Sequence, residues 1–228
     1  MINKKVSLLF SFLIFLLGAC SNNQKQAEKA SEKKDTINAA TVTTTKKTIL
    51  FFGNSLTAGY GLDDPSAAFP ALIQVRVDSL GLPYSVINAG VSGETSSGGN
   101  SRIDWILKQP VDLFILELGA NDGLRGIPIE ETKKNLQAII DKVKTKNKDV
   151  KIILAGMLVP PNMGPDYSKA FKELFPELAK KNETLFIPFI LEGVAGEEKL
   201  NQGDGIHPTV EGHKMVMENV WKVVKDVL

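Results

Sequence analysis

A hydroxyl, an imidazole and a carboxylate in this chain are of the types that acyl transfer requires. Ser55 comes directly after an apolar run, and Gly53 before it allows a tight turn. His207 is followed by a proline, which restricts it to an extended or turn conformation, and Asp204 lies three residues before it. A carboxylate at that spacing can hold the Nδ1–H of the imidazole and leave Nε2 free as a base. These residues predict a nucleophilic serine paired with a histidine.

Donors for an oxyanion are also available. The candidates are the side-chain amide of Asn121 and the main-chain N–H groups of Gly90 and Ser55. Each candidate also has an ordinary explanation, since glycine, serine and asparagine favour turns, an aspartate such as Asp204 often caps a helix, and His207 would suit a surface loop. Their occurrence together is what favours a catalytic site.

The composition narrows the alternatives. Of the two histidines, His213 falls within a helical pattern, where we expect a packing residue that is partly buried or exposed. Two histidines and one cysteine cannot complete a zinc site without carboxylates, so we expect no metal site built from histidine and cysteine ligands. A net charge of +1 and 7% aromatic residues indicate no surface for nucleic acid.

The beginning of the chain has the pattern of an export signal. Two lysines precede an apolar run over residues 6–17, which is too short for a comfortable membrane span. The run ends in Leu-Gly-Ala before Cys20, and small residues before a cysteine are similar to a bacterial lipobox. The alternatives are a plain signal peptide with a chance cysteine, or an uncleaved anchor. Because the chain has no other cysteine, we expect residues 1–19 to be a lipoprotein signal peptide.

Residues 20–45 are polar and contain no aromatic side chain, so we expect a flexible tether between the lipidated Cys20 and a domain over residues 46–228. Cleavage after residue 19 leaves 25 basic and 26 acidic residues, so membrane attachment would depend on the acyl chains. We expect a monomer in the bacterial cell envelope that faces the periplasm or the exterior.

From residue 46 onward, short apolar runs alternate with helical patterns. Strands are expected at 48–52, 84–87, 111–118, 150–154 and 185–187, and helices at 66–80, 100–108, 130–146, 167–181 and 209–227. This alternation predicts an α/β fold with a five-stranded parallel sheet, and right-handed crossovers make it a three-layer, doubly wound domain. Ligands bind outside the carboxyl ends of such strands. Four polar, glycine-containing segments are expected there: 53–56, 88–95, 119–122 and 204–208.

These four segments resemble the sequence blocks of the SGNH (GDSL-type) hydrolase superfamily. They occur in the family's order from about Thr48 onward, with Asp-x-x-His near the end. The stretch Gly-Asn-Ser-Leu-Thr-Ala-Gly-Tyr-Gly-Leu from Gly53, together with residues 164–167 and 192–194, is similar to the bacterial thioesterase/lysophospholipase/arylesterase branch. One residue departs from the pattern, because Asn54 stands where the family usually has aspartate.

The resemblance implies a flavodoxin-like αβα sandwich. It also implies a catalytic triad of Ser55, Asp204 and His207, with an oxyanion hole made by Ser55, Gly90 and Asn121. The implied reaction is hydrolysis of a carboxylic ester or thioester through an acyl-enzyme, without cofactor or metal.

Small esters, thioesters or lipids are therefore the expected substrates. Segments 158–167 and 189–200 are either walls of an acyl groove or ordinary connections. A carbohydrate O-acetylesterase of the cell envelope would use the same catalytic residues. A non-catalytic, ligand-binding lipoprotein is a further alternative. A nucleotide-binding protein has least support, because no Gly-x-Gly-x-x-Gly follows the first strand.

Overall fold

The computed structural model of this chain describes residues 45–228. The predicted signal peptide, residues 1–19, lies outside the described residues, and so does the predicted tether apart from Thr45. Both stay predictions, as does lipidation of Cys20. Within residues 45–228, no helix combines the length and the apolar character that a membrane span needs.

Five parallel strands form the single sheet of the domain, in the order β2-β1-β3-β4-β5. The strands are β1 (Lys47–Gly53), β2 (Tyr84–Gly90), β3 (Leu113–Glu117), β4 (Lys151–Ala155) and β5 (Leu185–Ile187). The order reverses direction at β1, because β2 pairs on one side of it and β3 on the other. A doubly wound sheet offers its binding crevice at such a reversal.

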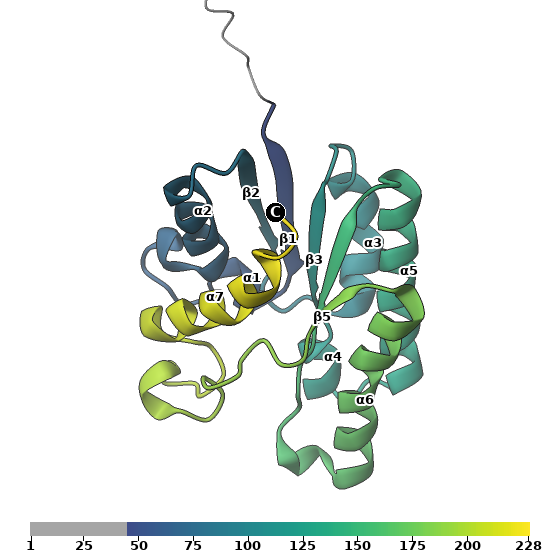
Figure 1. Ribbon diagram of the computed structural model, residues 1–228. Coiled ribbons are helices and arrows are strands. Elements are labelled where there is room, and N and C mark those ends of the chain that lie inside the picture. Colours follow the sequence, from purple (N-terminus) through teal and green to yellow (C-terminus); the bar gives the residue numbers. More distant parts are fainter. Residues whose placement is uncertain (1–44) are drawn as a thin grey trace, which may run out of the picture. The chain divides into compact units, whose positions relative to one another are not determined.

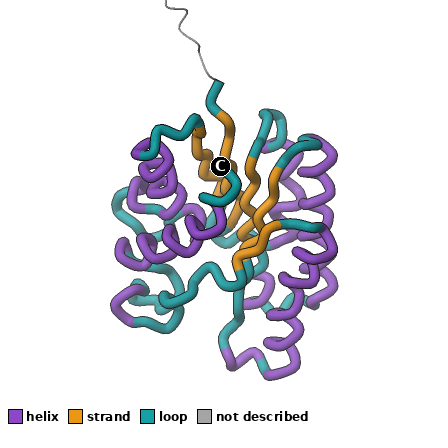
Figure 2. Tube along the Cα trace, viewed as in Figure 1, coloured by secondary structure: helices purple, strands orange, loops and turns teal. Residues whose placement is uncertain are grey.

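Helices cover both faces of the sheet, as Figures 1 and 2 show. α2 packs against α7 on one face, and α3, α5 and α6 lie together on the other. The helices are α1 (Ser55–Ala58), α2 (Phe69–Ser79), α3 (Ser96–Ile106), α4 (Ala120–Leu124), α5 (Ile129–Lys146), α6 (Pro165–Asn182) and α7 (Val210–Val224). The prediction of a three-layer α/β sandwich with five parallel strands is confirmed.

The core lies between the sheet and these helices. All five residues of β3 are buried, as are the last five of β1, which explains why the central strands are nearly continuous apolar runs. The long helix α5 buries one stripe, with Leu136, Ile139, Ile140 and Val143 at helical spacing. The two central strands are therefore rigid supports for whatever follows them.

Several element bounds differ from the sequence prediction, and the differences at β2 and α3 bear on the site. β2 continues to Gly90, three residues beyond the apolar run, because it is the edge strand and does not need burial on both faces. α3 begins at Ser96 rather than at residue 100, although Gly98 and Gly99 are poor helix formers. Thr95 caps this helix, and a Cβ on Gly99 would come within 2.4 Å of Leu118 Cδ1.

Candidate active site

Ser55 is the first residue of a four-residue helix, α1, which begins immediately after the central strand β1. Asn54 caps the helix by accepting a hydrogen bond from the Leu56 N–H at 3.0 Å, and Gly59 ends it with a φ of 76°. Sequence reasoning expected only a turn here. Gly53 has no left-handed φ, but its missing Cβ matters, because a Cβ would lie 2.1 Å from Thr57 Oγ1.

His207 and Asp204 lie in the loop between β5 and α7, where the aspartate holds the histidine. Asp204 Oδ1 accepts hydrogen bonds from the main-chain N–H groups of Ile206 and His207, at 2.9 and 3.0 Å. Asp204 Oδ2 lies 2.6 Å from His207 Nδ1. The His207 main-chain N–H, the His207 ring and the Ile206 N–H together lower the pKa of Asp204 to about 2. The anionic carboxylate favours a proton on Nδ1, which leaves Nε2 as an acceptor.

The tertiary fold brings Ser55 to this pair. Ser55 Oγ lies 2.9 Å from His207 Nε2, although the two residues are 152 positions apart in the chain. The ring of Tyr60, which is half exposed, packs against the imidazole with 4.7 Å between ring centroids. Two hydrogen bonds thus connect the Ser55 hydroxyl, the His207 imidazole and the Asp204 carboxylate one after the other.

Gln202 connects the two segments that carry these groups, and sequence reasoning missed it. Its Nε2 donates to the carbonyl of Tyr60 at 2.8 Å and to the carbonyl of Pro208 at 2.9 Å. Its main-chain N–H donates to the carbonyl of His207 at 2.7 Å. Gln202 therefore ties the chain after α1 to the loop of the imidazole, and no local pattern marks such a role.

Gly90 lies beside α1, at the end of an edge strand rather than in a loop. Its N–H donates to Asn88 Oδ1 at 3.0 Å, and Asn88 Nδ2 donates to the carbonyl of Thr57 at 2.7 Å. A Cβ on Gly90 would lie 2.3 Å from the main-chain nitrogen of Ala58. Glycine at this position thus allows α1 to pack directly on β2, and its N–H is already partnered.

Asn121 belongs to the short helix α4, which follows the other central strand. Its Nδ2 donates one hydrogen to the carbonyl of Glu94 at 3.0 Å, and the amide has a second hydrogen to donate. The Glu94 carboxylate pairs with Arg102, whose guanidinium lies 4.0 Å from the centre of the Phe52 ring. This network fixes the orientation of the Asn121 amide.

The neighbouring Asp122 is a structural residue that sequence reasoning did not single out. It is completely buried and accepts hydrogen bonds from the main-chain N–H and the hydroxyl of Ser96 and from the hydroxyl of Thr132. These bonds join α4 to the start of α3 and to α5. Asp122 thereby anchors the helix that carries Asn121.

The family is decided by comparison of the whole domain. Residues 51–215 match the GDSL-like Lipase/Acylhydrolase family, and this range includes every candidate site residue. The chain belongs to this GDSL-like family. It is accordingly a hydrolase of ester bonds.

Relatives in the GDSL-like family are similar over most of their length. Esterase TesA of Pseudomonas aeruginosa is 39% identical over 183 residues, which are 80% of this chain and 90% of the relative. Thioesterase 1/protease 1/lysophospholipase L1 of Escherichia coli K12 is 38% identical over 172 residues, 75% of this chain and 80% of the relative. The crystal structure of esterase EstA from Pseudoalteromonas, inhibited by monoethylphosphonate, superimposes with a TM-score of 0.75 at 33% identity. That match covers 79% of this chain and 98% of EstA.

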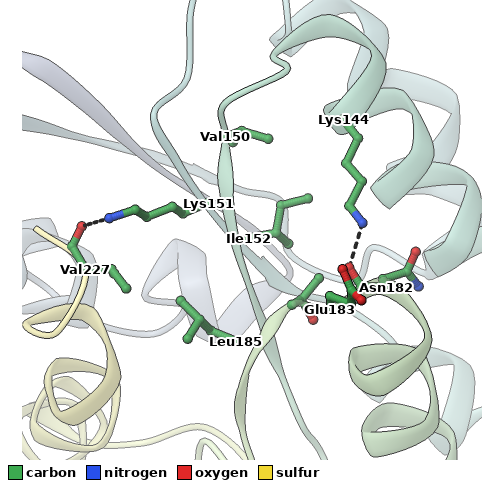
Figure 3. A pocket seen from close by; sticks show the side chains of 9 residues that line it. Lys144, Val150, Lys151, Ile152, Asn182, Glu183, Leu185 and Val227 are labelled. Carbon is green, nitrogen blue, oxygen red and sulfur yellow. Dashed lines mark hydrogen bonds between the residues drawn. The ribbon is translucent and has the colours of Figure 1, made fainter.

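A hollow of about 410 Å³ lies away from the GDSL-like site, at the amino ends of β4 and β5 (Figure 3). Its two lysines are already bound to main-chain carbonyls, Lys144 to that of Asn182 at 2.6 Å and Lys151 to that of Val227 at 2.8 Å. It contains none of the candidate site residues, so it has no part in the chemistry of the opposite edge.

Proposed function

We propose that Ser55 is the nucleophile of this ester hydrolase, that His207 is its general base, and that Asp204 orients and charge-balances His207. The observation that carries the proposal is the pair of hydrogen bonds, 2.9 Å from Ser55 Oγ to His207 Nε2 and 2.6 Å from His207 Nδ1 to Asp204 Oδ2. The low pKa of Asp204 supports it, because an anionic carboxylate stabilises the imidazolium that forms during catalysis.

The proposed reaction has two steps. Ser55 Oγ attacks the carbonyl carbon while its proton passes to His207 Nε2, and the tetrahedral intermediate then expels an alcohol or thiol, which takes that proton. Water attacks the acyl-enzyme and gives a proton to His207 Nε2. The acid leaves, and Nε2 returns the proton to Ser55 Oγ.

The oxyanion would be stabilised by the N–H groups of Ser55 and Gly90 and by the amide of Asn121. These donors differ in whether their hydrogen already has an acceptor. The second hydrogen of Asn121 Nδ2 is available, whereas the N–H of Gly90 must be shared with Asn88 Oδ1. We therefore assign the larger part of oxyanion stabilisation to Asn121 and to the N–H of Ser55, the first residue of its helix.

For the substrate, we propose carboxylic esters or thioesters with an apolar acyl or aryl group. An apolar group would find contacts with exposed apolar side chains on the segments that follow the carboxyl ends of the strands, whereas the hydroxyl groups of a sugar would find no hydrogen-bond partner in aliphatic side chains. These exposed side chains are Tyr60, Val91, Leu124, Leu158 and Ile206. The relatives named as esterase and thioesterase/lysophospholipase support the same class. The alternative remains an O-acetylesterase for envelope glycans.

Labelling with a fluorophosphonate tests the nucleophile directly. We expect the wild-type protein to be labelled on Ser55, Ser55→Ala to be neither labelled nor active, and Asp204→Asn to react much more slowly. Ser101→Ala is the matched control, since that hydroxyl is exposed and bonded to its own helix at the Ser97 carbonyl. Turnover of Ser55→Ala at the wild-type rate would refute the assignment.

A substrate panel then tests the class of ester. p-Nitrophenyl esters of increasing acyl length, acyl-CoA, lysophospholipid and acetylated glycans would be compared by kcat/KM. We expect higher values for apolar acyl and aryl esters than for acetylated glycans. The reverse order would favour the O-acetylesterase, and absence of both labelling and turnover would favour a binding protein.

We also propose that the enzyme is a monomer tethered to a membrane of the bacterial cell envelope through acyl chains on Cys20. The lipobox-like sequence before this cysteine supports the tether. In cells fed an alkyne-bearing fatty acid, the wild-type protein should acquire the label and sediment with membranes, and Cys20→Ser should do neither. Equal labelling of both would contradict lipidation at this residue.

A further inference from the structure

A buried carboxylate lies directly beneath the turn that carries Ser55. Glu117, the last residue of β3, is 1% exposed. It accepts three hydrogen bonds from that turn: from Asn54 Nδ2 at 2.8 Å, from the Asn54 N–H at 3.2 Å and from the Thr57 hydroxyl at 2.7 Å. Neither the predicted triad nor the predicted oxyanion hole includes this residue.

The hydrogen-bond partners of Glu117 are polar but uncharged. They come from the residue after β1 and from α1, namely Asn54 and Thr57. The nearby Arg102 donates to the carbonyl of Gly53 at 3.5 Å, but it pairs with Glu94 instead. Burial raises the pKa of Glu117 to about 7, against the opposing effect of hydrogen bonds from Thr57 and Asn54.

Glu117 determines which way the Asn54 amide points. All three contacts bring a donor to a Glu117 oxygen, so Glu117 acts as the acceptor and the NH₂ end of Asn54 faces it. The other end, Oδ1, then faces the N–H of Leu56 at 3.0 Å and Ser55 Oγ at 3.4 Å. One buried amide thus connects Glu117 to the cap of α1, and its oxygen is a second, more distant acceptor for the hydroxyl hydrogen that Ser55 directs to His207 Nε2.

We propose that Glu117 is a positioning residue for the nucleophile, and that it acts by fixing the Asn54 amide in this orientation. The proposal rests on the assignment of Ser55 as the nucleophile. In this chain the buried pair at positions 54 and 117 consists of an amide and a carboxylate, so it carries at most one negative charge. The hydrogen-bond pattern, rather than the position of the charge, is what holds Ser55.

Glu117→Gln breaks this pattern with little change in volume. Both carboxylate oxygens of Glu117 accept hydrogen bonds, but the introduced amide has only one oxygen. When that oxygen accepts from the Asn54 N–H and the Thr57 hydroxyl, the introduced NH₂ group faces Asn54 Nδ2, and two donors oppose each other. The Asn54 amide must then turn over and lose the cap of α1, or leave a buried donor unpaired. We expect kcat to fall roughly 10- to 100-fold with little change in KM, because a buried donor left without an acceptor costs about 1–3 kcal/mol.

The double substitution Asn54→Asp with Glu117→Gln restores the pattern with the charge exchanged. The introduced amide then donates its NH₂ to the introduced carboxylate, and its oxygen accepts from the main-chain N–H at position 54 and from the Thr57 hydroxyl. The second oxygen of the introduced carboxylate caps α1 at the N–H of Leu56. We expect this variant to recover most of the kcat that Glu117→Gln loses. A merely space-filling role for Glu117 would give no such recovery.

Asp112→Asn is the matched control, because Asp112 bonds β3 to β1 at their opposite ends through the N–H of Thr48 at 2.7 Å. Its kcat should equal that of the wild type. Circular dichroism and thermal unfolding would establish that each variant is folded, and kcat, KM and the rate of fluorophosphonate labelling would be measured for all of them.

Wild-type kcat and labelling rate in Glu117→Gln would overturn the proposal, and so would a folded double variant no faster than the single one. Failure of the wild-type protein itself to be labelled at Ser55 would instead overturn the assignment of the nucleophile.

Discussion

Asp204 remains ionised well below neutral pH, because hydrogen bonds from His207 and Ile206 lower the pKa of its carboxyl to about 2. The imidazole of His207 is therefore always paired with an anion under ordinary conditions. The Tyr60 ring packs against the imidazole at an angle of 47°, which limits how far the imidazole can turn away from Ser55 Oγ. At the scale of single residues, the base is held by its chain neighbours and by one aromatic contact.

Asn121 provides the residue-scale prediction. Asn121→Ala should lower kcat by roughly 10²–10³-fold, because the amide stabilises a charge that is present only in the intermediate and the transition state. Steady-state kinetics with a p-nitrophenyl ester measure this effect. Asn121→Asp, which keeps the shape but removes the donor, should be at least as slow. A loss that appeared in KM alone would contradict the assigned role.

At the scale of elements, the site depends on two short helices placed at the ends of the two central strands. α1 follows β1 and α4 follows β3, so both begin at the buried carboxyl ends of central strands (Figure 1). α1 also lies directly on β2, where Gly90 leaves room for the main chain of Ala58. The position of Ser55 is therefore sensitive to the distance between α1 and the edge strand.

Gly90→Ala tests this packing. Its added Cβ would come within 2.3 Å of a main-chain nitrogen, which cannot rotate away as a side chain can, so α1 must shift. We expect a loss of about 1–3 kcal/mol in the free energy of unfolding and a strongly reduced kcat. Urea unfolding and ester hydrolysis would measure the two effects.

Gly203→Ala is a suitable control for that experiment, since Gly203 has open space around it and no left-handed φ. It should behave as the wild type does. A Gly90→Ala protein with normal stability and activity would show that α1 has more freedom than the structure indicates.

At the scale of the whole molecule, two buried groups make stability depend on pH in opposite directions. Burial raises the pKa of Glu117 from 4.5 to about 7, so its contribution to stability is lost as the pH rises through that range. His213 is completely buried, and burial followed by the charge of His207 lowers its pKa from 6.5 to about 4. Its contribution is lost as the pH falls, because the unfolded chain takes up the proton first.

His213→Asn separates the two contributions. An asparagine oxygen can still accept the hydrogen bond that His213 Nδ1 accepts from the N–H of Phe69 at 3.2 Å, but it does not titrate. In this variant the pH dependence due to Glu117 is no longer offset by that of His213. The free energy of unfolding should therefore increase by up to about 3 kcal/mol as the pH is lowered from 7 to 4.5. The wild type should change much less over the same range.

Urea unfolding at a series of pH values measures both profiles. The pKa of Asp204 is lowered rather than raised, so its contribution to the free energy of unfolding is lost only below about pH 3.8, outside the range compared. Parallel profiles for the two proteins would refute the opposing roles. The structure also corrects the expectation for His213, which is neither exposed nor partly buried.

The sequence by itself determined the features that depend on near neighbours. The unbroken apolar run at 48–52 indicates a buried strand, and the helical spacing of apolar residues at 130–146 indicates a helix. The observed β1 and α5 agree with these predicted bounds within one residue at each end. The pairing of Asp204 with His207 was also predictable, because three residues of loop keep the two side chains together. The family blocks, in their order, added the fold and the ester chemistry.

Only the tertiary structure decided which distant groups meet. Ser55 and His207 are 152 residues apart, Gln202 and the Tyr60 carbonyl 142, and Glu117 and Asn54 63. No local periodicity encodes such contacts, because they arise from strand order and from the close approach of α1 to β2. For the same reason Gly53 and Gly90 looked like turn residues, whereas packing against neighbours distant in the chain is what requires them to be glycine.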